Sequence, residues 1–138
     1  MKIITVADVQ YISHRYAKET MGFAEPIPIF ETRFPNVLES CLAIPFQKFF
    51  GKVAYRGLEG KAAIMFYLMI KNHPFQNGNK RIAVTTLLVF LFKNSKWLKI
   101  DNQELYNFAV WVAKSPAELK NEVVFAIGKM VEKHLEDY

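Results

Sequence analysis

The sequence predicts an all-α fold in which five or six helices surround a buried central pair. Apolar residues recur at helical spacing along most of the chain, and two segments are apolar on nearly every side, which is typical of helices that are buried all round. With 138 residues, of which 51% are hydrophobic and 22% charged, the chain has the length and composition of one globular domain, residues 1–138.

The first predicted helix covers residues 6–18. Thr5 and Asp8 stand at the spacing of a capping box, in which two side chains satisfy each other's backbone N–H groups at a helix start. Gly22 and the cluster at residues 26–28, Pro-Ile-Pro, end this helix and form a loop. The apolar residues at helical spacing are Val6, Val9, Ile12 and Tyr16.

A short helix and an aromatic connection come next. Asn36 is a potential N-cap for the helix, and Pro45 stops it. Cys41, the single cysteine of the chain, is interpreted as a buried, small apolar residue of this helix. The aromatic stretch from Phe49 to Tyr55 predicts a connection that resembles a hairpin.

The central pair consists of predicted helices over residues 58–72 and 82–92, both apolar on nearly every side. Pro74 disfavours helical geometry for the residue before it, so the first of these helices is expected to end at His73. A loop that contains Gly78 separates the two helices. Because neither helix has a polar face to turn to solvent, we expect them to pack together in the core.

Two amphipathic helices complete the predicted fold. Asp101 and Glu104 mark the start of one helix. Ser115, Pro116 and Glu118 mark the next, as an N-cap, a proline at the first helical position and an acidic residue at the third. The apolar stripes consist of Leu105, Phe108, Trp111 and Val112 in the first helix, and Leu119, Val123, Ile127, Met130 and Leu135 in the second.

The net charge of +5 comes entirely from the middle of the chain. Residues 61–113 carry seven basic and two acidic residues, whereas residues 1–60 carry seven and six, and residues 114–138 carry four and five. Proteins that bind nucleic acid usually cluster Lys and Arg in stripes, and the scattered basic residues here argue against polynucleotide binding. A basic excess around one loop suits a smaller polyanion, such as the phosphate chain of a nucleotide.

The chain is expected to be cytoplasmic, with no membrane attachment. Its longest uncharged stretch in the apolar middle, residues 82–92, has eleven residues, well short of the roughly 20 that span a bilayer. Asp8 interrupts the N-terminus before the apolar core of a signal peptide could form. A single cysteine can form neither an internal disulfide nor a zinc site with a second cysteine, in keeping with a reducing compartment.

The loop between the central helices carries the candidate chemistry. Residues 73–81 read HPFQNGNKR, and they lead into the N-terminus of a buried helix, where free N–H groups and the helix dipole attract anions. Lys80 and Arg81 are unfavourable at a helix start by ~0.3–1 kcal/mol each, and a bound phosphate would remove that conflict. His73 can accept a proton near neutral pH. Taken singly, each of these residues is common in structural turns and caps, whereas their combination favours a functional site.

This loop resembles the signature of the Fic/Doc family, His-x-Phe-x-(Asp/Glu)-(Gly/Ala)-Asn-(Gly/Lys)-Arg, and its Asn-Lys-Arg ending looks like the death-on-curing (Doc) branch. Residues 38–42, Leu-Glu-Ser-Cys-Leu, are similar to a family Leu-Glu-Ser-Ala-Leu segment before Pro45. Residues 49–51 resemble the family's aromatic flap, and residues 59–63 lead into the motif helix as expected. The resemblance covers roughly residues 1–113 and implies a Fic/Doc-type helical domain.

The family moves part of a nucleoside triphosphate to a protein hydroxyl. Fic relatives transfer AMP from ATP, and the Doc branch transfers the terminal phosphate to a translation factor as a toxin held by a separate antitoxin. The resemblance implies that His73 is the general base and that Asn79 holds phosphate oxygens. Gly78 would let the backbone approach the phosphates, and Lys80 and Arg81 would neutralise phosphate charge in the transition state.

The remaining motif positions have expected roles as well. Phe75 is interpreted as a core residue that anchors the loop. The flap residues, by the same resemblance, would hold the target segment as an extended strand. They are Phe49, Phe50, Lys52 and Tyr55.

Two positions depart from the family pattern. Asn77 stands where the family holds Mg²⁺ through an acidic side chain, and the neighbouring Gln76 offers no carboxylate either, so Mg²⁺ binding is weakened. Val84 stands where relatives that transfer AMP carry another arginine, which favours transfer of the terminal phosphate. The chain has no match to the family's inhibitory pattern Ser/Thr-x-x-x-Glu-Gly/Asn, so a separate antitoxin is the expected partner.

Several functions therefore stay open. The first is a Doc-like enzyme that transfers phosphate, or alternatively AMP, from ATP to a Ser or Thr hydroxyl of a target protein. The second is a binding protein of the same fold in which Asn77 has abolished transfer. Another donor in the same pocket, such as a different nucleotide or a phosphocholine compound, and polynucleotide binding complete the alternatives.

Overall fold

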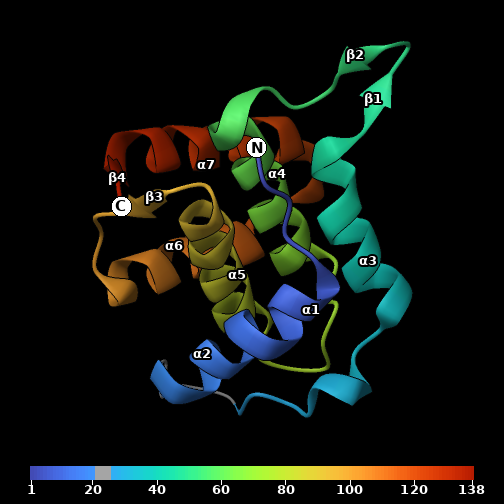
Figure 1. The fold of residues 1–138 in the computed structure, drawn as a ribbon, viewed down its shortest axis with the longest axis vertical. Coiled ribbons are helices and arrows are strands. Elements are labelled where there is room, and N and C mark those ends of the chain that lie inside the picture. The colour runs from blue at the N-terminus through green and yellow to red at the C-terminus, as the bar shows by residue number, and fades with distance from the viewer. Residues whose placement is uncertain (21–25) are drawn as a thin grey trace.

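The computed structural model describes residues 1–20 and 26–138 and shows a mostly helical protein, as the sequence predicts (Figure 1). Two long helices, α4 (Gly57–Lys71) and α5 (Asn79–Lys93), form its centre and pack against each other. The other helices surround this pair. Gly22, which was expected to end the first helix, lies outside the described residues.

The central pair is buried on all sides. Every residue of α4 from Ala62 to Ile70 and every residue of α5 from Arg81 to Leu91 is buried, which confirms the prediction from their apolar sequences. α5 begins at Asn79, three residues before the predicted apolar segment. The polar residues of its first turn carry no apolar periodicity, so the sequence pattern could not mark the start.

The N-terminal helical stretch contains a π-helical turn. It consists of α1 (Val6–Asp8), a π-helical segment (Val9–Ser13) and α2 (His14–Thr20), two residues beyond the predicted end. The capping box is confirmed: the Thr5 hydroxyl accepts from Asp8 N at 3.1 Å, and the Asp8 carboxylate accepts from Thr5 N at 2.8 Å. The hydroxyl of Thr85 in α5 donates to the Ser13 carbonyl at 2.8 Å, which ties the π-helical turn to the central pair.

Helix α3 (Pro35–Ala43) has Phe34 at its N-cap and Pro35 in its first turn, so the prediction that Asn36 caps it is wrong. The fixed φ of proline suits the first helical position, which explains the earlier start. Pro45 lies in a 3₁₀ turn (Ile44–Phe46) that directly follows the helix. Cys41 is fully buried as predicted, and burial raises the pKa of its thiol to about 12.

A two-stranded hairpin connects α3 to α4, as the aromatic stretch predicts. Strands β1 (Lys48–Phe49) and β2 (Lys52–Val53) pair antiparallel through a turn at Phe50 and Gly51. All four strand residues are exposed, and the hairpin projects away from the helical body (Figure 1).

Helices α6 (Asn102–Lys114) and α7 (Lys120–His134) form the C-terminal part. Asp101 caps α6 as predicted, accepting from Gln103 N at 3.0 Å. Ser115 does not cap α7: its hydroxyl donates to the Val112 carbonyl at 2.6 Å and so belongs to the end of α6. A 3₁₀ turn (Ala117–Leu119) precedes α7 instead.

The C-terminal segment adds a strand pair that the helical pattern did not predict. Strands β3 (Lys96–Leu98) and β4 (Leu135–Asp137) pair antiparallel, so Leu135 lies in a strand rather than in the last helix. Lys96 forms an ion pair with Asp137 across this pair. Among the described residues, no helix is both long enough and apolar enough to cross a lipid bilayer.

Asp8 joins the first helix to the end of α5, and we expect its loss to destabilise the protein. Its carboxylate accepts from Thr5 N and from Lys93 Nζ, the latter at 2.5 Å. Burial raises the pKa of Asp8, but its hydrogen bonds with Lys93 and Thr5 outweigh burial, so the pKa lies below the ordinary value of 3.8. Asp8→Asn should lower the free energy of unfolding at neutral pH by about 1 kcal/mol.

The sign of the pH dependence follows from the lowered pKa. The stabilisation by Asp8 is present above the ordinary pKa of 3.8 and is lost as the pH falls below it, so the wild type and Asp8→Asn should converge in acid. Urea unfolding at several pH values measures this difference. Glu19→Gln, which removes an exposed ion pair with Arg15, is the control and should change stability little. An Asp8→Asn deficit that persisted in acid would contradict the assignment.

Candidate active site

The candidate site is the loop of residues 72–78 between α4 and α5. α4 ends at Lys71, two residues before the predicted end, with Asn72 as its C-cap. His73 has a φ of 50°, a left-handed conformation that is uncommon for residues other than glycine, and the helix cannot continue through it. Such backbone strain is often found where a side chain must be held in a particular direction for function.

Phe75 anchors this loop in the core, as predicted. Its side chain is 1% exposed. Its ring lies 5.9 Å from the ring of Phe30 and 6.1 Å from that of His14, centroid to centroid. The Nε2 atom of buried His14 also forms a hydrogen bond of 2.6 Å with the Pro28 carbonyl. The first helix and residues 28–30 therefore form the socket that holds the loop.

The side chain of Asn79 organises the loop from the other side. Its Oδ1 accepts from Phe75 N at 2.9 Å, and its Nδ2 donates to the Phe75 carbonyl at 2.8 Å. Because a backbone N–H can only donate, these two bonds fix which amide atom is oxygen and which is nitrogen. The Nδ2 atom then lies 3.4 Å from His73 Nδ1, a long contact in which the imidazole nitrogen is the acceptor.

A small cavity of about 190 Å³ lies at this loop. It brings together motif residues with the ends of α4 and α6. The lining residues are Ile70, His73, Gln76, Asn77, Asn79, Lys80 and Ala113. Sites that enclose a drug-sized ligand usually measure about 300–1,000 Å³, so this cavity is smaller than a site that encloses a whole ligand of that size.

The electrostatics of the cavity favour an anion. Lys80 lines it, and the N-terminus of the 15-residue helix α5 opens at the same place. None of the described lining residues carries a carboxylate. Arg81 does not line the cavity and is 4% exposed within α5, so the structure separates the two cations that the sequence placed together.

The lining residues do not fit a magnesium ion held by the protein. Asn77 and Gln76 offer amide oxygens only, and Lys80 adds positive charge beside them. Mg²⁺ in proteins usually relies on one or two carboxylates together with substrate phosphates. The described part of the chain also contains no group of three or more His, Cys, Asp or Glu residues placed to hold a metal ion.

Gly78 is required by two independent features. It is the N-cap of α5 with a φ of 69°, a conformation that favours glycine. A Cβ at this position would also lie 2.8 Å from Ile27 Cδ1. Ile27 therefore makes a close approach that only glycine at this position permits, and the approach of a phosphate to the Gly78 backbone stays a prediction.

The structure does not bring the hairpin to the cavity. The residues Phe49, Phe50, Lys52 and Tyr55 precede α4, and His73 follows it. A helix of 15 residues is ~22 Å long at 1.5 Å per residue, so the hairpin and the loop of residues 72–78 lie at opposite ends of α4 (Figure 1). The segment beside the loop is residues 26–34 instead.

Contacts of that segment were missed by sequence reasoning. Phe34 N donates to the Pro74 carbonyl at 2.9 Å, and Ile27 and His14 make the contacts described above. His14 lies with Val9, Ser13 and Ala17 on the buried side of the first helix, which is not the side that the apolar residues of the sequence predict. No pattern in the sequence marks Ile27 or Phe34 either.

Helix α6 is fastened to the same end of α4. Lys71 Nζ donates to the Ser115 carbonyl at 2.5 Å and to the Ala113 carbonyl at 3.3 Å. These carbonyls lie at the end of α6, where a lysine side chain replaces missing helical partners. Because Ala113 lines the cavity, this contact fixes one of its walls.

We expect Asn79→Ala to loosen the loop without unfolding the helices. The substitution removes both hydrogen bonds to Phe75, at a cost of about 1 kcal/mol. The amide proton of Phe75 should exchange faster with solvent, as measured by NMR, while the Ile82 amide, which donates to the Gly78 carbonyl at 2.9 Å, should be unaffected. Asn77→Ala changes an exposed asparagine of the same loop and serves as the control. Unchanged exchange at Phe75 in Asn79→Ala would contradict this role.

Comparison with known proteins places the chain in a family. A family model described as Fic/DOC family matches residues 3–91, which include α4, the loop and most of α5. No curated protein and no solved structure matches the chain. The matched residues make up more than half of the sequence and contain the His73 loop with its cavity. The chain therefore belongs to the Fic/DOC family.

Proposed function

We propose that this protein transfers the terminal phosphate of ATP to a Ser or Thr hydroxyl of a target protein. Membership of the Fic/DOC family supports a transferase of this general type. The observation that carries the proposal is the cavity in which His73 and Lys80 meet at the start of α5. It offers a proton acceptor and an anion site in one small cavity of about 190 Å³.

In the proposed reaction, Nδ1 of His73 takes the proton of the target hydroxyl, because Nε2 carries the ring proton when Nδ1 accepts from Asn79. The hydroxyl replaces the long 3.4 Å contact of Asn79 at this nitrogen. The hydroxyl oxygen forms a bond to the terminal phosphorus, the bond from that phosphorus to the bridging oxygen breaks, and ADP leaves. Lys80 and the α5 N-terminus stabilise the negative charge that redistributes over the phosphate oxygens. His73 is exposed and lines the cavity, so both substrates can reach it.

Two motif residues act by positioning in this proposal. Asn79 uses its side chain to hold Phe75 and to contact His73, so it sets the geometry of the loop rather than binding phosphate. Arg81 is buried in α5, outside the cavity lining, and adds positive charge at the start of the helix.

The finer features of the proposal follow the resemblance to the Doc branch. Val84, fully buried on α5, provides no arginine for the phosphates that an AMP transfer retains, and this favours transfer of the terminal phosphate. A translation factor as target, toxicity, and a separate antitoxin as partner belong to the same proposal. AMP transfer is the alternative reaction of the same site.

A second candidate is a nucleotide-binding protein that has lost transfer. Asn77 favours it, because the cavity lining offers no carboxylate for Mg²⁺. In this case the anion site at Lys80 keeps its affinity for phosphates, and the protein acts by binding.

Labelled ATP separates these reactions. We would incubate the protein with cell lysate and Mg²⁺, using ATP labelled at the terminal phosphate or at the α-phosphate, with His73→Ala as the blank. We expect label on protein from the terminal phosphate only. Label from the α-phosphate only would assign AMP transfer. ATP binding with neither label, or transfer that survives His73→Ala, would refute the proposed reaction.

Restoring the acid tests the role of Asn77. Asn77→Asp should increase magnesium-dependent transfer at least about tenfold, because a carboxylate then holds the metal beside the phosphates; tenfold corresponds to ~1.4 kcal/mol. Gln76→Glu adds the same charge at the neighbouring lining position and is the matched control. A similar gain in both variants would assign the effect to charge alone, and no gain in Asn77→Asp would show that the donor is held without a carboxylate at this position.

A further inference from the structure

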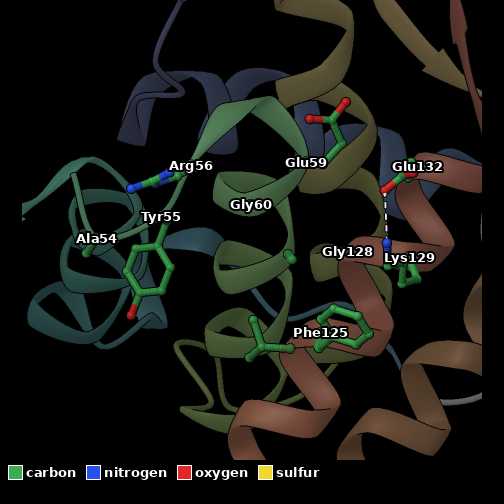
Figure 2. A pocket seen from close by; sticks show the side chains of 11 residues that line it. Ala54, Tyr55, Arg56, Glu59, Gly60, Phe125, Gly128, Lys129 and Glu132 are labelled. Atoms are coloured by element: carbon green, nitrogen blue, oxygen red, sulfur yellow. Dashed lines mark ion pairs between the residues drawn. The ribbon is translucent and has the colours of Figure 1, made fainter.

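The far end of α4 carries a second surface, which we call the hairpin groove. It consists of two adjoining hollows that share Arg56. One, of about 290 Å³, lies between the start of α4 and α7 (Figure 2). The other, of about 530 Å³, lies between α4 and the hairpin and includes Lys52 and Lys61. On α4 the groove is lined by residues no further along than Ala63, whereas the cavity at His73 begins at Ile70, so the two are separate sites.

The two hollows of the groove differ in charge. The hollow beside the hairpin has only basic charged residues in its lining, whereas the hollow between α4 and α7 is lined by both basic and acidic residues. Residues 40–58 contain no acidic residue, while Lys48, Lys52 and Arg56 fall within them. Lys61 adds a fourth cation, although its Nζ already donates to the Tyr55 carbonyl at 2.6 Å. Basic residues gathered on one surface attract acidic partners and speed their association.

The residue at the tip of the hairpin, Phe50, is unfavourable for the turn that it forms. Phe50 and Gly51 have φ values of 53° and 75°, the pattern of a hairpin turn for which Asn-Gly is the favoured sequence. A phenylalanine in this conformation is strained, and its side chain is 103% exposed, so it gains no packing energy in return. Strain that stabilises nothing within the chain points to a contact outside it.

The hollow between α4 and α7 is apolar at its base. Ala63 of α4 faces Gly128 of α7, where a Cβ would lie 3.8 Å from the Ala63 Cβ, and Gly60 of α4 lines the same hollow. Small residues on both helices therefore leave space above the contact. Phe125, which is 66% exposed, and Lys129, whose amino group lies 5.3 Å from the Phe125 ring centroid, form the rim on α7 (Figure 2).

We propose that the hairpin groove docks an acidic segment of a partner protein. An apolar side chain of that segment enters the hollow between α4 and α7, its carboxylates lie against Lys52 and Arg56, and Phe50 packs on its apolar surface. This docking is separate from the proposed transfer at His73 and does not depend on it. A protein fits better than a nucleic acid, because the hollow between α4 and α7 takes an apolar side chain while Glu59 and Glu132 would repel an anion there. The carboxylates of the segment lie instead at the neighbouring hollow, whose charged lining residues are all basic.

Selection from a random peptide library tests the proposal. We would immobilise the full chain, enrich displayed peptides, and measure the affinity of the enriched sequences by fluorescence anisotropy. We expect enriched peptides to combine Asp or Glu with an aliphatic or aromatic residue. The double variant K52E/R56E should weaken their binding at least about tenfold. K18E/K99E, with the same change of net charge at exposed lysines outside the groove, should bind them as the wild type does.

A second variant separates docking from folding. Phe50→Asn removes the ring but suits the left-handed backbone, so the hairpin should be at least as stable while peptide affinity falls several-fold. Enrichment of neutral or basic peptides, no enrichment, or equal losses in K52E/R56E and K18E/K99E would overturn the proposal. Tighter binding of a single-stranded oligonucleotide than of the acidic peptides would assign the surface to nucleic acid instead.

Discussion

The hydrogen bonds between the Asn79 side chain and the backbone of Phe75 hold the candidate site together. Phe75 is buried in the loop that joins α4 and α5, so its backbone polar groups must find partners within the protein. The Asn79 side chain bonds both backbone groups of Phe75, the N–H through its Oδ1 and the carbonyl through its Nδ2. Its Nδ2 also contacts His73. The geometry of the proposed base is thus linked to the packing of the Phe75 anchor in its socket.

Both ends of α4 are rich in positively charged residues. From residue 40 to residue 100 the only acidic residue is Glu59, and basic residues lie before α4, within it and after it. At the His73 end, positive charge meets a small cavity and a helix N-terminus, an arrangement that suits phosphate. At the hairpin end, it meets an apolar hollow and exposed aromatic rings, which suit a protein surface.

Much of the fold could be predicted from the sequence, and the failures have physical causes. The central helices, the capping box of Thr5 and the cap at Asp101 follow from local patterns that tertiary structure does not override. Asn36 and Ser115 have the chemistry of caps, but neighbouring prolines determine where the next helical turn begins. The β3–β4 pair joins residues about 40 positions apart. The spacing of apolar residues within a short window does not predict pairing between such distant segments.

The site was predicted in its residues but not in its surroundings, since contacts with Ile27 and His14 depend on how separate segments meet. One of these contacts has an evolutionary consequence. Shortening Ile27 would remove its clash with a side chain at position 78, yet the left-handed φ of 69° would still disfavour any such side chain. A change at residue 27 therefore does not release position 78 from its preference for glycine, so the constraint between the two acts in one direction only.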